Sequence, residues 1–157
     1  MEAVVTSVVA VVGTLLGAGT THLFQRRETE RSHALAREEK LRQERIDAYC
    51  AYAGALLEYR RVLVHRWFVL HDGDELCGED TPELREEQYK ARRTAQEAMF
   101  RAQLVSDDTA VVELTEQLMA GVTELHSVPD RNALTTLRSR TRQEIRDFVT
   151  TVARRVR

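Results

Sequence analysis

The sequence contains few of the residues that interrupt helices, with two prolines and seven glycines among 157 residues. Both prolines, Pro82 and Pro129, fall in the C-terminal half. No run of strand length alternates between apolar and polar residues at a period of two, the pattern typical of a half-buried β-strand. These absences exclude a β-rich domain and predict an all-α fold.

The sequence also lacks the short motifs that carry known chemistries. Its five histidines are scattered, with no H-E-x-x-H motif and no pair of E-x-x-H motifs of the kind that builds metal sites in helical bundles. There is no glycine-rich phosphate loop and no G-x-S-x-G elbow. The two cysteines form no C-x-x-C pair. We therefore expect no enzyme activity, no cofactor and no resident metal ion.

One acidic stretch is the remaining candidate for a cation site. It runs from His71 to Asp80, contains two glycines and breaks the helical pattern. It lacks the spacing and the closing bidentate glutamate of an EF-hand, so a solvated turn is the favoured interpretation over a metal site. We expect single alanine substitutions of four of its acids to change activity little; these acids are Asp72, Asp74, Glu79 and Asp80.

Charge is absent from the N-terminal segment between Ala3 and Phe24. As a helix this segment would be about 33 Å long, enough to cross a bilayer. An export signal would carry positive charge before the apolar run, whereas this chain begins with Met1 and Glu2. Because the arginines follow the segment, the positive-inside rule predicts a single-pass plasma-membrane protein with its N-terminus outside and its body in the cytoplasm. A buried soluble helix and a signal peptide are the alternatives.

A small-residue motif lies inside this predicted membrane span. Gly13 and Gly17 form a G-x-x-x-G pattern, which lets two membrane helices approach closely. We therefore expect a homo-oligomer in which these two glycines face each other. Glycine is also common in membrane spans that do not self-associate.

The rest of the chain divides by composition into a stalk and a bundle. Residues 1–27 are the predicted anchor with its flanking arginines, and residues 28–45 form a charged helical stalk with a weak heptad pattern that includes Ala34 and Leu41. Residues 46–157 form a cytoplasmic bundle of four up-and-down helices, the first of which continues from the stalk. Thr81, Asp108 and Asp130 are candidate residues for starting the three later helices.

Apolar stripes at helical spacing predict the core of this bundle. The first stripe includes three large aromatic residues, Tyr49, Tyr52 and Trp67. The predicted inward positions are Tyr49, Tyr52, Ala53, Leu56, Leu63, Trp67, Leu70, Ala91, Ala95, Ala98, Ala102, Val111, Leu114, Leu118, Val122, Leu125, Leu134, Leu137, Ile145, Phe148, Val152 and Val156.

The last helix carries an excess of positive charge that can contact anionic lipid or a DNA backbone. A solvated face is the favoured interpretation, because the basic residues are spread around the helix and no aromatic residues lie between them for stacking. The candidate contact residues are Arg138, Arg142, Arg146, Arg154 and Arg155.

Four stretches together resemble a known family. They are VVAVVGTLLGAGTTHLFQRR, LRQERIDAYCAYAGALLEYRRVLVHRW and FRAQLVSDDTAVVELTEQLM, with IRDFVTTVARRVR closing the chain. In layout they are similar to the KilB proteins of actinomycete conjugative plasmids. The resemblance implies a membrane-anchored helper of plasmid transfer or intermycelial spread that acts with other membrane or transfer-machinery proteins. Two alternatives remain, a membrane-tethered module that binds nucleic acid or anionic lipid, and a soluble helical bundle of unknown activity.

Overall fold

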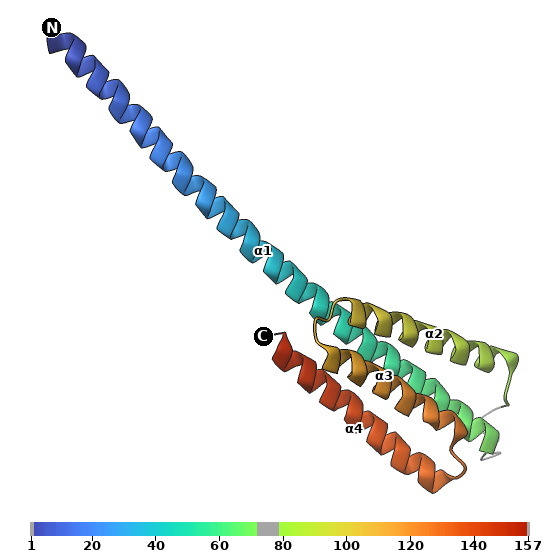
Figure 1. Ribbon diagram of the computed structural model, residues 1–157. Coiled ribbons are helices and arrows are strands. Elements are labelled where there is room, and N and C mark those ends of the chain that lie inside the picture. Colours follow the sequence, from blue (N-terminus) through green and yellow to red (C-terminus); the bar gives the residue numbers. More distant parts are fainter. Residues whose placement is uncertain (1, 72–78, 157) are drawn as a thin grey trace. The chain divides into compact units, whose positions relative to one another are not determined.

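The computed structural model describes the backbone of residues 2–71 and 79–156, and the side chains of residues 32–71 and 79–156. All regular secondary structure in these residues is helical, which confirms the all-α prediction. The elements are α1 (Glu2–His71), α2 (Pro82–Leu104), α3 (Thr109–Thr123), a 3-10 helix η1 (Glu124–Ser127) and α4 (Arg131–Arg155), as Figure 1 shows. The chain divides into two compact units, residues 1–41 and residues 42–157.

The first unit is the N-terminal part of α1, helical from Glu2 onward. The predicted membrane anchor (residues 1–27) and its two motif glycines, Gly13 and Gly17, have side chains outside the described residues, so both remain predictions. In the part of the chain whose side chains are described, no helix has the length and apolarity needed to cross a bilayer. Residues 32–41 are exposed, including Leu35 and Leu41 at 66% and 51%.

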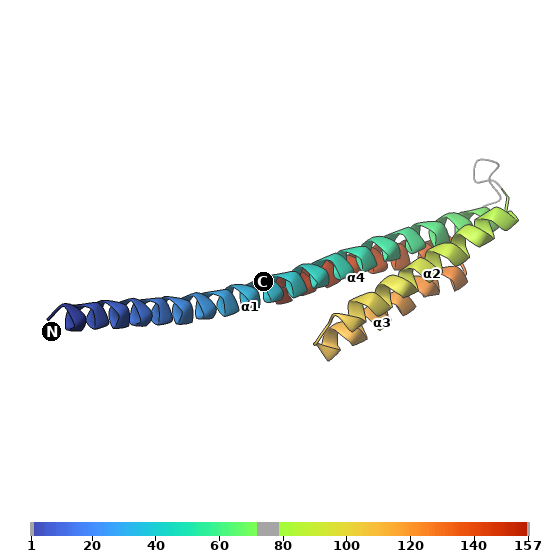
Figure 2. The same ribbon diagram turned by 90° about the horizontal axis from the view of Figure 1, so that it is seen from above.

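The second unit is a four-helix bundle whose consecutive helices run antiparallel. Near the start of the unit, Arg45 Nε donates to the carbonyl oxygen of Val105 at the C-terminal end of α2 (3.0 Å). Near the other end, Arg66 Nη1 donates to Gln88 in the first turns of α2. The pairing with α4 is also antiparallel, because Arg42 Nε donates to the Val156 carbonyl oxygen (2.6 Å). In Figure 2 this part of α1 overlies α4, while α2 overlies α3.

The three predicted capping residues begin the three later helices. The Thr81 hydroxyl accepts from the backbone N–H of Leu84, and Pro82 occupies the first turn of α2, where a missing N–H does no harm. Asp108 and Asp130 cap α3 and α4 in the same way with their carboxylates. Two predicted boundaries were wrong. His71 belongs to α1, and α3 ends at Thr123, where the chain tightens into η1.

The core contains most of the predicted positions. At its centre the rings of Tyr52 and Phe148 pack edge to face with centroids 5.6 Å apart, and both are almost fully buried. Leu70 was predicted to be buried but is 50% exposed, since it lies in the last turn of α1. Tyr59 and Met99 are buried residues that the stripe analysis missed.

Candidate functional site

Four arginines form a row along one side of α4. Arg131, Arg138, Arg142 and Arg146 are separated by seven, four and four residues. At 3.6 residues per turn they fall within about 80° of one another and extend along about 22 Å of helix. The expectation that the basic residues of this helix are spread around it was therefore wrong for these four.

A fifth arginine joins the row from α1. Arg60 Nη2 donates to the carbonyl oxygen of Arg138 (2.7 Å), and its Nε donates to the hydroxyl of Thr141 (3.1 Å). Partial burial lowers the pKa of Arg60, and the charges of Arg138 and Arg142 lower it further. Arg60 thus lies close enough to Arg138 and Arg142 to be repelled by both. The sequence analysis missed Arg60 because it considered the last helix alone.

An aromatic ring lies beside this cluster. The guanidinium carbons of Arg131 and Arg138 are each 5.8 Å from the ring centroid of Phe68, within the range of a cation–π contact. Phe68 comes from α1 and is only partly buried. The sequence analysis did not place an aromatic residue beside these arginines, because Phe68 lies on a different helix.

The nearby carboxylates of the two helices are engaged on other sides. Glu58 binds Arg61, which also reaches Glu87 on α2. Glu144 binds Arg140 (3.0 Å). Asp147 lies about 140° around α4 from Arg142 and accepts a hydrogen bond from Gln143.

The five arginines therefore place positive charge along one surface. Among the described residues, neither Arg142 nor Arg146 forms an ion pair, and both are exposed. A surface of this kind can bind an extended anion, since guanidinium groups form bidentate hydrogen bonds with phosphate and carboxylate. We call this surface the basic face and define it by Arg60, Arg131, Arg138, Arg142 and Arg146.

The basic face includes three of the five predicted contact residues, Arg138, Arg142 and Arg146. Arg155 instead forms an ion pair with Asp108, the residue that caps α3. Arg154 lies about 120° around α4 from Arg142, away from the row. Anion binding by any of the five stays a prediction, and Arg154 and Arg155 do not share the surface of the other three.

An apolar crevice follows the basic face along the seam between α1 and α4. It has a volume of about 260 Å³, and Ile46, Tyr49, Val149 and Val152 are among the residues that line it. Cys50, a free and exposed thiol, lies at its edge. Most of its described lining residues are apolar, which suits packing against another apolar surface.

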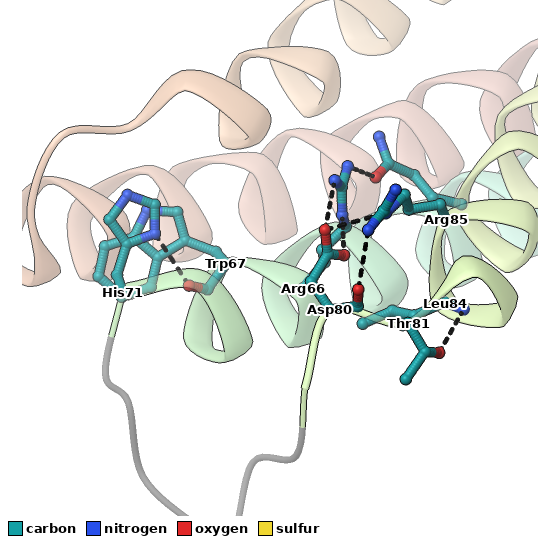
Figure 3. Close-up of polar contacts among 8 residues, drawn as sticks. Arg66, Trp67, His71, Asp80, Thr81, Leu84 and Arg85 are labelled. Atoms are coloured by element: carbon teal, nitrogen blue, oxygen red, sulfur yellow. Dashed lines mark hydrogen bonds and ion pairs between the residues drawn. The ribbon is translucent and has the colours of Figure 1, made fainter.

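A polar network joins the end of α1 to the start of α2 (Figure 3). The Asp80 carboxylate accepts from Arg66 Nε (2.9 Å) and from Arg85 Nε (3.0 Å). The hydrogen bond from Arg66 holds the pKa of Asp80 below its usual range, and the positive charges of Arg66 and Arg85 lower it further. Asp80 is therefore a structural link between two helices, which corrects its interpretation as a residue of a solvated turn.

The candidate cation site falls mostly outside the described residues, which end at His71 and resume at Glu79. Within the described part, no group of three or more histidine, cysteine, aspartate or glutamate residues is placed to hold a metal ion. His71 stacks on Trp67, with ring centroids 4.4 Å apart, and its Nδ1 lies 3.0 Å from the Trp67 carbonyl oxygen (Figure 3).

Comparison with known proteins connects this chain to plasmid transfer. Residues 46–156 match the family model described as KilB plasmid transfer protein. Over 158 aligned residues the chain is 31% identical to Protein KilB of Streptomyces lividans, and the alignment covers 96% of this chain and 97% of that protein. No solved structure matches the chain.

Proposed function

We propose, because this chain belongs to the family of KilB plasmid transfer proteins, that it assists the conjugative transfer or intermycelial spread of a plasmid as a membrane-anchored helical interaction protein. The similarity to the Streptomyces lividans protein carries this proposal. It extends over nearly the full length of both chains, whereas the family model matches residues 46–156, so the N-terminal segment is included.

Membrane anchoring is a more specific part of the proposal than the role in plasmid transfer. It is supported by the absence of charge between Ala3 and Phe24 and by the arginines that begin at Arg26. An anchor of this kind confines the bundle to the inner surface of the membrane. Confinement raises the effective concentration of the bundle at any partner located there, without new chemistry.

The bundle itself is proposed to act through contacts. The description of the family names plasmid transfer and no catalytic activity. The basic face favours a second candidate function, a membrane-tethered module that binds nucleic acid or anionic lipid, since Arg142 and Arg146 are exposed and form no ion pair with a described residue.

The test is a mating experiment with a plasmid whose own copy of the gene is replaced by variants. Deletion of residues 1–25 should abolish transfer or spread, while circular dichroism of the shortened protein should still show a folded helical bundle. As the matched control, an unrelated single-pass apolar segment in place of residues 3–24 should restore function. A protease site placed after Arg157 should resist external protease in intact cells.

Two results would contradict this proposal. Full transfer from the form without residues 1–25 would show that the anchor is not needed. Transfer that persists when the whole gene is removed would show that the protein does not assist the process at all.

A further inference from the structure

We propose that the basic face binds the phosphate backbone of duplex DNA without preference for base sequence. This inference rests on the proposed function, because plasmid transfer brings DNA to the protein. The inference assigns a binding partner to the basic face, a surface that the family description does not mention.

The geometry of the face fits a regularly charged rod. Arg138, Arg142 and Arg146 are one turn apart along α4, so their side chains leave the helix at intervals of about 6 Å. The row from Arg131 to Arg146 is about 22 Å long, which corresponds to about six phosphates along one strand of a duplex. The protein has a formal net charge of −2, so attraction to DNA must come from such a local surface.

The cluster around Arg60 supplies an electrostatic reason for binding an anion. Arg60 is held beside Arg138 by its hydrogen bond to the Arg138 carbonyl oxygen. The positive charges of Arg138 and Arg142 repel Arg60, and none of these three arginines forms an ion pair with a carboxylate among the described residues. A phosphate group placed between them would relieve this repulsion and form charge-assisted hydrogen bonds.

The same face is poorly suited to a lipid surface. Helices that lie on membranes place large apolar side chains beside their basic residues. In the described part of α4 the exposed large apolar residue is Val149, which lies beyond the arginine row. Between the arginines are Thr135 and Ser139, whose hydroxyls donate to carbonyl oxygens four residues earlier in the helix.

The contacts should involve the DNA backbone and not its bases. Proteins that bind single strands use open aromatic faces on which bases stack. Phe68 is the aromatic residue at this face, and Arg131 and Arg138 both lie against it. Arginine contacts to phosphate position a protein on DNA and do not read its sequence.

The experiment measures binding of a fluorescein-labelled 30-base-pair duplex to the full chain in nanodiscs of neutral phosphatidylcholine. Fluorescence anisotropy is recorded between 50 and 200 mM NaCl. The test variant carries Arg138→Gln, Arg142→Gln and Arg146→Gln. The control variant carries Arg92→Gln, Arg93→Gln and Arg101→Gln, which removes the same charge from exposed positions on α2.

We expect the test variant to bind at least about tenfold more weakly and the control to stay within about threefold of the wild type. Loss of three phosphate contacts should also reduce the slope of log K against log salt concentration by about 2.7. A second duplex of unrelated sequence should give the same affinity. Circular dichroism and the melting temperature establish that both variants remain folded.

Several outcomes would overturn the inference. These are no measurable binding by the wild type, equal weakening in test and control variants, and binding to separate phosphatidylglycerol vesicles but not to duplex DNA. The mating experiment separates this failure from that of the proposed function. If the test variant transfers plasmid normally while deletion of residues 1–25 abolishes transfer, the DNA contact is wrong and the proposed function stands.

Discussion

The indole Nε1 of Trp67 donates a 2.8 Å hydrogen bond to the backbone carbonyl oxygen of Val128. Trp67 is 4% exposed and belongs to α1, whereas Val128 lies in the segment between η1 and α4. One side chain therefore fills part of the core and also satisfies a buried carbonyl in the connection between η1 and α4. This contact fixes where α4 begins relative to α1.

Trp67→Ala should lower the free energy of unfolding by about 3–5 kcal/mol, because it removes a large buried aromatic side chain. Trp67→Phe keeps much of the volume and loses the hydrogen bond, so it should cost about 1–3 kcal/mol. Urea unfolding followed by circular dichroism measures both values. If the two variants cost the same, the hydrogen bond and not the packing would account for the effect of Trp67.

The Asp80 network predicts a loss of stability in acid. The pKa of Asp80 is lower in the folded protein than in the unfolded chain, where it is about 3.9, so ionised Asp80 stabilises the fold above that pH. This contribution is lost as the pH falls through the lower, folded pKa. Asp80→Asn should therefore melt below the wild type at pH 7, and the difference should shrink below about pH 4.

Thermal melting from pH 7 to pH 2.5 measures this dependence. Glu79→Gln is the matched control, because Glu79 is the exposed neighbour of Asp80. A constant difference between wild type and Asp80→Asn across the whole range would mean that the ion pairs with Arg66 and Arg85 do not contribute. In the mating assay, loss of activity by Asp80→Asn without loss of stability would favour a functional role for this acid.

Gly54→Ala should stabilise the bundle by about 0.5–1 kcal/mol. Gly54 lies on an exposed side of α1, and a Cβ atom built there meets no atom within 4 Å. Alanine is favoured over glycine inside a helix because it loses less backbone entropy on folding. Gly121→Ala is the comparison, since its Cβ would meet Glu144 Oε2 at 3.5 Å and Arg140 Nη2 at 3.9 Å.

We expect a gain at Gly121 as well, because both of these distances are ordinary van der Waals contacts. Urea unfolding of the two variants gives the comparison. A loss of stability in Gly54→Ala would indicate that another copy of the chain or another molecule packs against this glycine in solution.

Local signals in the sequence predicted the helices well. Thr81, Asp108 and Asp130 each precede an apolar stripe, and the structure confirms each as a helix cap because capping depends on residues two or three positions apart. Core positions such as Phe148 and Leu134 followed from the period of the helix.

The basic face could be predicted only in part, since it depends on contacts between helices. Arg60 and Phe68 are separated from Arg138 by more than sixty residues in the chain. Periodicity places residues around one helix and gives no information about which side of α1 meets α4. The same limit explains why the role of Asp80 was not predicted. In the sequence Asp80 is one acid of a polar loop, whereas in the structure it pairs with arginines from two helices.

The last prediction concerns self-association through Gly13 and Gly17. If residues 3–24 cross the membrane, these glycines allow two copies to pack backbone against backbone, and β-branched side chains would hold the copies apart. Gly13→Ile combined with Gly17→Ile in the full chain should therefore weaken any dimer that survives in mild detergent. Chemical cross-linking and analytical ultracentrifugation measure the dimer fraction.

Gly19→Ile is the matched control, because Gly19 lies outside the motif but in the same segment. If the double variant dimerises as strongly as the wild type, the contact between copies lies in the stalk or the bundle. In that case the exposed Leu35 and Leu41 become the next residues to replace, since both lie in the stalk where a coiled coil would form.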